Sequence, residues 1–95
     1  GSNNTITNNS IFIGGNTRAL NNNETNQIVI GDSAIGLGSN SVVLGNTSIT
    51  RTQLRGQVIM GAFDSPPTGI EGAIYYDSTT KKHYGFDGTT WNALY

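Results

Sequence analysis

Apolar residues in the first half of the chain occur as short triplets that repeat. Each triplet follows an asparagine and a small or polar residue and is closed by a glycine, in residues 9–14, 26–31 and 40–45. The closing glycines are 17 and then 14 residues apart, and the longer step contains a polar insertion near residues 21–25. Ile and Val dominate the triplets, which predicts β-strands rather than helices. A strand repeated at this interval predicts a β-roll or β-solenoid.

Three consecutive apolar residues place side chains on both faces of a strand. The outer positions of a triplet, such as Ile28 and Ile30, point to one face and the middle position to the other. We expect the outer positions to fill the inside of each coil. Because the rest of each coil is polar, the middle positions then need cover from further copies of the chain around an axis. The predicted interface between copies consists of Phe12, Val29, Val43, Leu54 and Val58.

Asparagine is abundant between the triplets. Its side chain can form hydrogen-bonded ladders between coils, and it tolerates the left-handed backbone conformation of turns. We expect these structural uses of asparagine.

The last third of the chain carries three short aromatic-rich segments, residues 73–76, 83–86 and 91–95. Asp77 starts the first connection between them and Asp87-Gly88 the second, which is typical of hairpin turns. The pattern predicts a three-stranded antiparallel β-meander.

Changes in composition divide the chain into four parts. Gly1 and Ser2 have the character of an expression scar, and the β-roll is expected over residues 3–46. A neck and connector with a Pro-rich break follow over residues 47–69, and the meander occupies residues 70–95. The predicted class is all-β.

Composition excludes several classes of function. Only 12% of the residues are charged, the net charge is −1 and cysteine is absent. Such a chain offers no basic surface for nucleic acid and no disulfide or thiolate metal site. No apolar run approaches the roughly 20 residues of a spanning helix, so we expect no membrane insertion. One histidine and six dispersed carboxylates form no recognisable motif, so we predict no enzyme activity, no metal and no cofactor.

Aromatic and polar residues of the meander are the main candidates for binding a ligand. An aromatic ring can stack on the apolar face of a sugar while nearby polar side chains bond its hydroxyls. The candidate ligand-binding residues are Trp91, Tyr84, Tyr75, Tyr76, His83, Asp77 and Asp87. Alternatively, so small a sheet needs most of its aromatic side chains for its own core or for contacts between copies. Turn capping is likewise an alternative role for the two aspartates.

The repeat resembles the head repeat of trimeric autotransporter adhesins. Residues 28–45 carry the resemblance most clearly, and it extends over roughly residues 9–46. Heads of that family are left-handed parallel β-rolls of three chains, so the resemblance implies a homotrimer. The sequence departs from the family at Phe12 and Val29, where a small residue is usual.

Two later stretches resemble parts of other fibres. Residues 41–58 are similar to the neck after such heads and to β-roll exits in bacteriophage tail fibres. Residues 72–80, together with 88–91, resemble a module of tail fibres and tail-fibre-like bacterial adhesins. The resemblances imply the distal segment of an extracellular homotrimeric fibre, on a virion tail or a cell surface.

Two functions follow from this reading. In the first, the tip adheres to a target-cell surface, with a cell-surface glycan or another surface receptor as the partner, and three weak sites on one axis gain avidity. In the second, the meander is a structural cap that registers three chains and has no ligand of its own.

Overall fold

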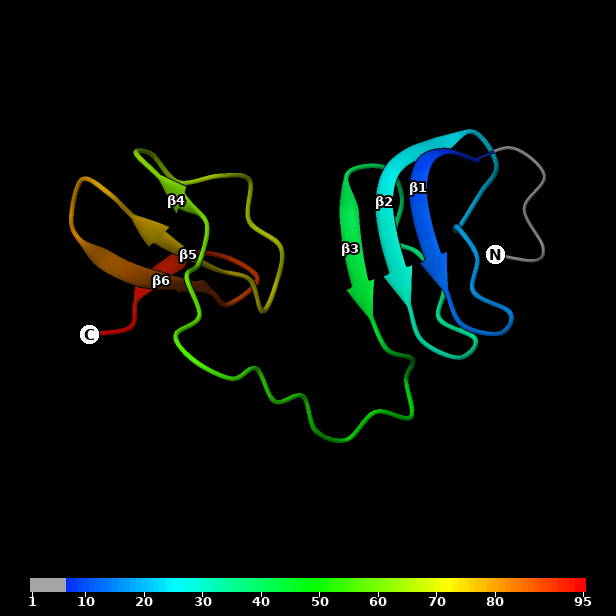
Figure 1. Ribbon diagram of the computed structural model, residues 1–95. Coiled ribbons are helices and arrows are strands. Elements are labelled where there is room, and N and C mark those ends of the chain that lie inside the picture. Colours follow the sequence, from blue (N-terminus) through cyan, green and yellow to red (C-terminus); the bar gives the residue numbers. More distant parts are fainter. Residues whose placement is uncertain (1–6) are drawn as a thin grey trace. The chain divides into compact units, whose positions relative to one another are not determined.

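The computed structural model describes residues 7–95, with side chains from residue 9 onward, and the predicted scar at residues 1–2 lies outside this range. All regular structure in the described range is β, which confirms the predicted class (Figure 1). The first sheet contains β1 (Thr7–Ile13), β2 (Glu24–Ile30) and β3 (Ser41–Leu44). The second contains β4 (Ala62–Phe63), β5 (Ile74–Asp77), β6 (Lys82–Phe86) and β7 (Trp91–Ala93). The chain divides into two compact units between Thr52 and Gln53.

The first sheet is parallel, and its register aligns the three triplets. Phe12 pairs with Val29, and Val29 pairs with Val43, so equivalent residues of the repeat lie side by side. The three arrows run in the same direction in Figure 1. Each triplet therefore forms the end of one strand, as the repeat predicts.

Asparagine holds the same strained position at the start of each triplet. Asn9, Asn26 and Asn40 have φ of 52°, 57° and 62°, a left-handed conformation that asparagine adopts more readily than most residues. The side-chain amide of Asn26 also donates a hydrogen bond to Asn40 Oδ1 at 2.8 Å. Both expected uses of asparagine, the ladder and the left-handed turn, are confirmed here.

Glycine is required where the triplets end. Gly14 and Gly31 have φ of 126° and 135°, and an added Cβ at Gly14 would lie 2.7 Å from the Gly31 carbonyl oxygen. A side chain at this position would thus push neighbouring strand ends apart.

Segments that return from each strand stack opposite the sheet. Arg18 and Ile35 pair as an isolated parallel bridge, and the Gly36 N–H donates to the Arg18 carbonyl at 2.8 Å. Small side chains of these segments and inward side chains of β2 form the interior of the first unit. Its members are Thr17, Ala19, Gln27, Val29 and Ala34, each at most 2% exposed.

The predicted assignment of the two triplet faces is wrong. Val29, expected between copies, is completely buried within the single chain, and Phe12 and Val43 share its face by register. Alternation along a strand has a period of two, whereas its phase depends on which side of the sheet the returning segment takes. The sequence predicts that alternate residues face opposite sides of the sheet, but it does not indicate which of the two sets faces the interior.

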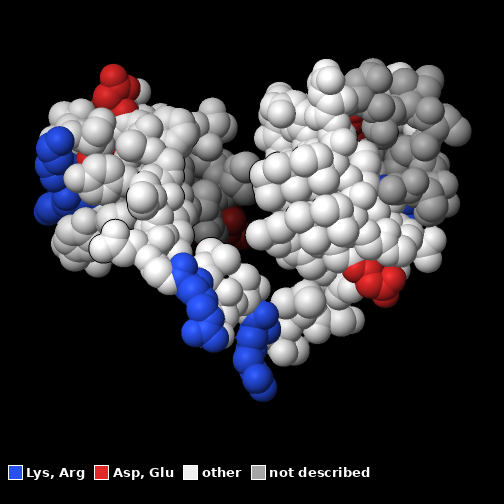
Figure 2. All heavy atoms as spheres, in the orientation of Figure 1, with Lys and Arg blue, Asp and Glu red and all other residues white. Residues whose placement is uncertain are grey.

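The outer positions of the triplets point away from this interior. We call them the outer aliphatic row: Ile11, Ile13, Ile28, Ile30, Val42 and Leu44. Ile11, Ile13, Val42 and Leu44 are each at least 50% exposed. In Figure 2 the visible surface over β1–β3 is almost entirely uncharged. The first unit thus presents an apolar face that the described chain leaves open.

The second sheet is mixed. β5 pairs antiparallel with β6 and β6 with β7, which confirms the predicted meander. A fourth strand, β4, pairs parallel with β5 and was not predicted. Residues 62–69 therefore belong to the second sheet and its cover rather than to a separate connector, because β4 and Pro67 both bond to the meander.

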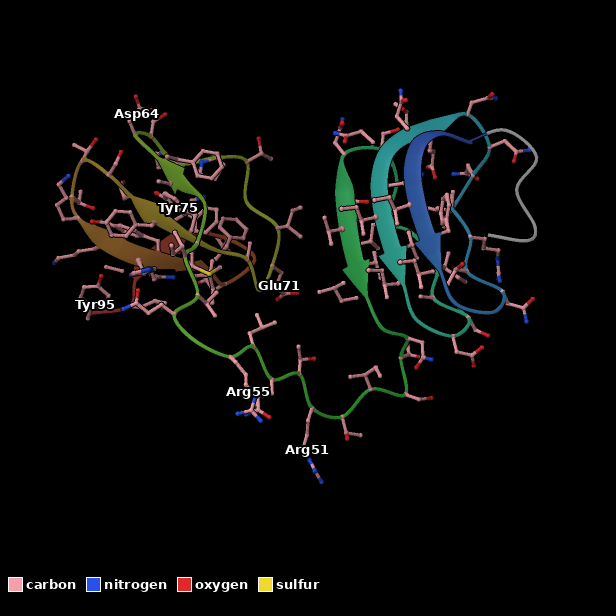
Figure 3. All side chains as sticks on the ribbon, viewed as in Figure 1. Arg51, Arg55, Asp64, Glu71, Tyr75 and Tyr95 are labelled. Carbon is pink, nitrogen blue, oxygen red and sulfur yellow. The ribbon has the colours of Figure 1, made fainter. Side chains whose placement is uncertain are left out.

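Residues 50–60 contain no regular secondary structure and are exposed apart from Met60. Arg51 and Arg55 extend from this connecting segment in Figure 3. Leu54 and Val58, predicted to lie between copies, are 58% and 52% exposed in the single chain.

Candidate functional site

Aromatic residues of the second sheet gather on one of its faces. Cross-strand pairing places Tyr75 beside Tyr84 and Phe86 beside Trp91. The Tyr75 ring meets Trp91 edge-on, with centroids 4.6 Å apart, and stacks on Tyr84 at 5.7 Å. Phe63 of β4 adds an edge contact to Tyr75 at 5.7 Å. We call this cluster the aromatic face, and its geometry is that of a small core.

The loop before β5 covers the aromatic face. Trp91 Nε1 donates a hydrogen bond to the Pro67 carbonyl at 3.1 Å. Gly69 lies so close to the Phe86 ring that an added Cβ would collide with it. The Pro-rich segment is thus held over the rings by a partly buried hydrogen bond and by a close approach that only glycine permits.

This cover contradicts part of the predicted ligand site. Tyr75 is only 3% exposed, so its ring cannot stack on a sugar. Tyr84 and Trp91 are half-buried in the same cluster. The alternative reading, in which a small sheet needs its aromatic residues for its own core, accounts for these three side chains.

Asp77 caps the turn between β5 and β6. Its Oδ1 accepts hydrogen bonds from the N–H groups of Thr79 and Thr80 at 2.8 and 3.0 Å, and Tyr75 donates to Oδ2 at 3.3 Å. The bond from the Thr80 N–H is the main reason that the pKa of Asp77 is lowered, against an opposing effect of burial. Burial, and secondly the Asp77 charge, raise the pKa of Tyr75. At 6% exposure, Asp77 is unavailable to a ligand.

Asp87 caps the turn between β6 and β7 in the same way. The N–H groups of Thr89 and Thr90 each lie 2.8 Å from Oδ1, and Asn92 donates to Oδ2 at 3.1 Å. The bond from Thr90, followed by that from Thr89, lowers the pKa of Asp87. Asp87 is exposed, but its oxygens are already occupied by the turn. The structure therefore separates both aspartates from any shared ligand site and gives each a structural role.

His83 lies on the other face of the sheet, which we call the open face. Cross-strand pairs place Tyr76 beside His83 and Ile74 beside Gly85 there. A groove of about 430 Å³ runs along this face. We call it the Tyr76–His83 groove, and its lining residues are Val58, Ile59, Met60, Ala62, Tyr76 and His83.

The predicted ligand-binding residues include Tyr76 and His83 but not Met60 or Tyr95. Alternation along β5 places Tyr76 opposite Tyr75, so the sequence held the signal that these two tyrosines face different surroundings. It held no signal for Met60, which reaches the groove only because β4 pairs with β5. Tyr95 lies beyond β7, and its hydroxyl meets His83 Nδ1 at 2.9 Å.

No group of three or more His, Asp or Glu side chains among residues 9–95 could hold a metal ion. No helix in the described range is long and apolar enough to cross a membrane. The features available for recognition are the outer aliphatic row and the Tyr76–His83 groove.

Comparison with protein-family models, with curated proteins and with solved structures gave no match to this chain.

Proposed function

We propose that this chain is a distal segment of a homotrimeric extracellular fibre that presents its second sheet for adhesion to a target-cell surface. In this proposal the first unit is a β-roll whose coils stack along the fibre. The outer aliphatic row is the observation that carries the proposal. The resemblance to the heads of trimeric adhesins is the reason for proposing that the assembly contains three chains.

Exposure of the outer aliphatic row is unfavourable for an isolated chain. Burying a Val, Leu or Ile side chain fully gains about 1.5–3 kcal/mol relative to leaving it in water. Four members of the row are at least half exposed, and they lie on adjacent strands rather than scattered singly. A contiguous apolar surface of this kind marks an interaction site. In the proposed assembly, further copies of the same chain bury all these side chains at once in a closed symmetric contact.

The connecting segment supports the same conclusion. Leu54 is 58% exposed, and Ile49, just before the segment, is 52% exposed. Leu54 therefore remains in the proposed interface, whereas Val29 is removed from it because it is buried within the chain, and Val58 because it lines the Tyr76–His83 groove. The outer aliphatic row replaces Phe12, Val29 and Val43 as the contact from the first unit.

Adhesion by such a fibre depends on multivalency. Three copies on one rigid axis present three identical sites, so individually weak contacts combine into strong attachment. A purely structural cap, in which the second sheet only registers the chains, remains the competing function, and the burial of Tyr75 favours it at that position.

Light scattering behind a sizing column tests the assembly. We expect a mass of about three protomers, and we expect Leu44→Asp to yield the monomer because the new charge would be buried between copies. Asn21→Asp, an exposed position in the connection between β1 and β2, is the matched control and should leave the mass unchanged. A monodisperse monomer for the unmodified chain would refute the proposal.

A further inference from the structure

We infer that the Tyr76–His83 groove binds a neutral saccharide. The inference deepens the proposed function, and it rests on it in one respect: weak sites need the fibre's several copies to produce measurable avidity. The site differs from the predicted one, because it lies on the open face and shares only Tyr76 and His83 with it.

Two rings and an apolar floor shape the groove. The Tyr76 and His83 rings lie 5.0 Å apart at a tilt of 60°, and Met60 and Ala62 complete the lining beside them. Both rings are half-buried, so each keeps part of its surface in solvent. A pyranose ring has an apolar C–H face that matches such a surface, and its edge carries hydroxyls that need polar partners.

His83 supplies one polar partner, which Tyr95 holds in place. The Tyr95 hydroxyl accepts a hydrogen bond from the His83 backbone N–H at 3.2 Å and forms a second hydrogen bond with His83 Nδ1 at 2.9 Å. Nδ1 is thus occupied, and Nε2 is the ring nitrogen left for a ligand hydroxyl.

Both polar atoms beside the groove are open to solvent. In the described part of the chain, the Gln27 amide atoms are the only buried side-chain nitrogens or oxygens without a hydrogen-bond partner. His83 Nε2 and the Tyr76 hydroxyl form no hydrogen bond to any described residue, so they cannot be buried. Sugar hydroxyls, which both donate and accept, suit this pair of groups.

The charge and size of the groove favour a neutral ligand. None of the six lining residues is Lys, Arg, Asp or Glu, so no group there compensates a phosphate or a carboxylate. A volume of about 430 Å³ falls within the range of small-ligand sites, roughly 300–1,000 Å³. The competing occupant is a second copy of the chain, whose aliphatic side chains would seal the groove.

An array of immobilised neutral, sialylated and phosphorylated oligosaccharides, probed with the full chain, tests this inference. We expect binding to neutral oligosaccharides. Tyr76→Leu should weaken binding about tenfold through loss of ring stacking, which corresponds to about 1.4 kcal/mol. Tyr76→Phe should weaken it less, because only the hydroxyl is lost. Tyr84→Phe removes the equivalent hydroxyl from the aromatic face and should leave binding unchanged.

Light scattering on each variant separates this inference from the proposed function. Binding that depends on Tyr76 at unchanged mass supports the saccharide site. No binding by an assembled protein, binding only to charged sugars, or equal binding by all variants overturns it. A lower mass for Tyr76→Leu would likewise overturn it and assign the groove to contact between copies.

Discussion

At the scale of the residue, Gln27 is the most unusual feature of the first unit. It is 2% exposed, and neither its amide nitrogen nor its amide oxygen has a hydrogen-bond partner. Gly36 on the returning segment makes room for it, since an added Cβ there would collide with Gln27 Oε1. The interior thus has room for the long Gln27 side chain because Gly36, which faces it, has no side chain of its own. Burying an amide that has no hydrogen-bond partner costs free energy. We therefore expect Gln27 to lower the free energy of unfolding relative to an apolar side chain of the same length.

We predict that Gln27→Met stabilises the protein. Methionine has a similar length and no unpaired polar atoms, so the free energy of unfolding should rise by about 1–2 kcal/mol. Thermal denaturation at fixed protein concentration measures the change. Gly36→Ala is the counterpart and should lower the melting temperature through the collision. If Gln27→Met destabilised the protein, the amide would have a partner that the described residues do not provide.

At the scale of the element, the two hairpins of the second sheet share one turn design. In both, the aspartate that precedes the turn accepts N–H bonds from residues two and three positions later. The same bonds lower the pKa of Asp77 and Asp87. The turns are thus stabilised most when both carboxylates are ionised, which links the stability of this sheet to pH.

Acid should destabilise the second sheet through these turns. A carboxyl whose folded pKa lies below its unfolded value contributes stability above the unfolded pKa, about 3.9, and loses it as pH falls through the folded pKa. We therefore predict that the melting temperature falls below about pH 4, and that Asp87→Asn flattens this decline. Asp64→Asn is the control, because no described residue donates a hydrogen bond to its carboxylate. Identical pH profiles for Asp87→Asn and the unmodified chain would contradict this role.

The elements also show how far sequence carried the candidate site. The hairpin turns, the three aromatic strands and the role of asparagine follow from neighbours a few residues away, and the structure confirms them. Tyr75 was predicted to bind a ligand, but it is buried on the covered aromatic face. Its burial depends on Pro67, Gly69 and β4, none of which adjoins it in sequence.

At the scale of the whole molecule, two small units are joined by an exposed segment. That segment contains Arg51 and Arg55 and no regular structure (Figure 3). Its aliphatic residues have no cover within the described chain. If Leu54 lies between copies, assembly should order and protect the segment.

Trypsin tests that protection. We predict that cleavage after Arg51 and Arg55 is about tenfold slower in the assembled protein than in the monomeric Leu44→Asp variant, because proteolysis needs an open segment. The masses of the fragments, followed over time, identify the cleaved bond. Cleavage after Lys81, in an exposed turn, is the internal reference and should differ little between the two. Equal rates of cleavage after Arg51 and Arg55 in the assembled protein and in the Leu44→Asp variant would place the segment outside the interface.

Local signals determined the strands and turns of this protein from sequence alone. These signals are the triplets closed by glycine, the asparagines in a left-handed conformation and the turns that begin with aspartate. Each depends on residues close together in the chain, so each can be predicted from the sequence. Only the tertiary structure decided which side of each sheet is covered. Val29 is buried and Ile13 exposed because the returning segment lies on one side of the first sheet. Tyr75 is buried and Tyr76 half-buried because the loop that contains Pro67 covers the aromatic face of the second sheet. A period of two is a local property, whereas its phase is fixed by contacts between distant residues.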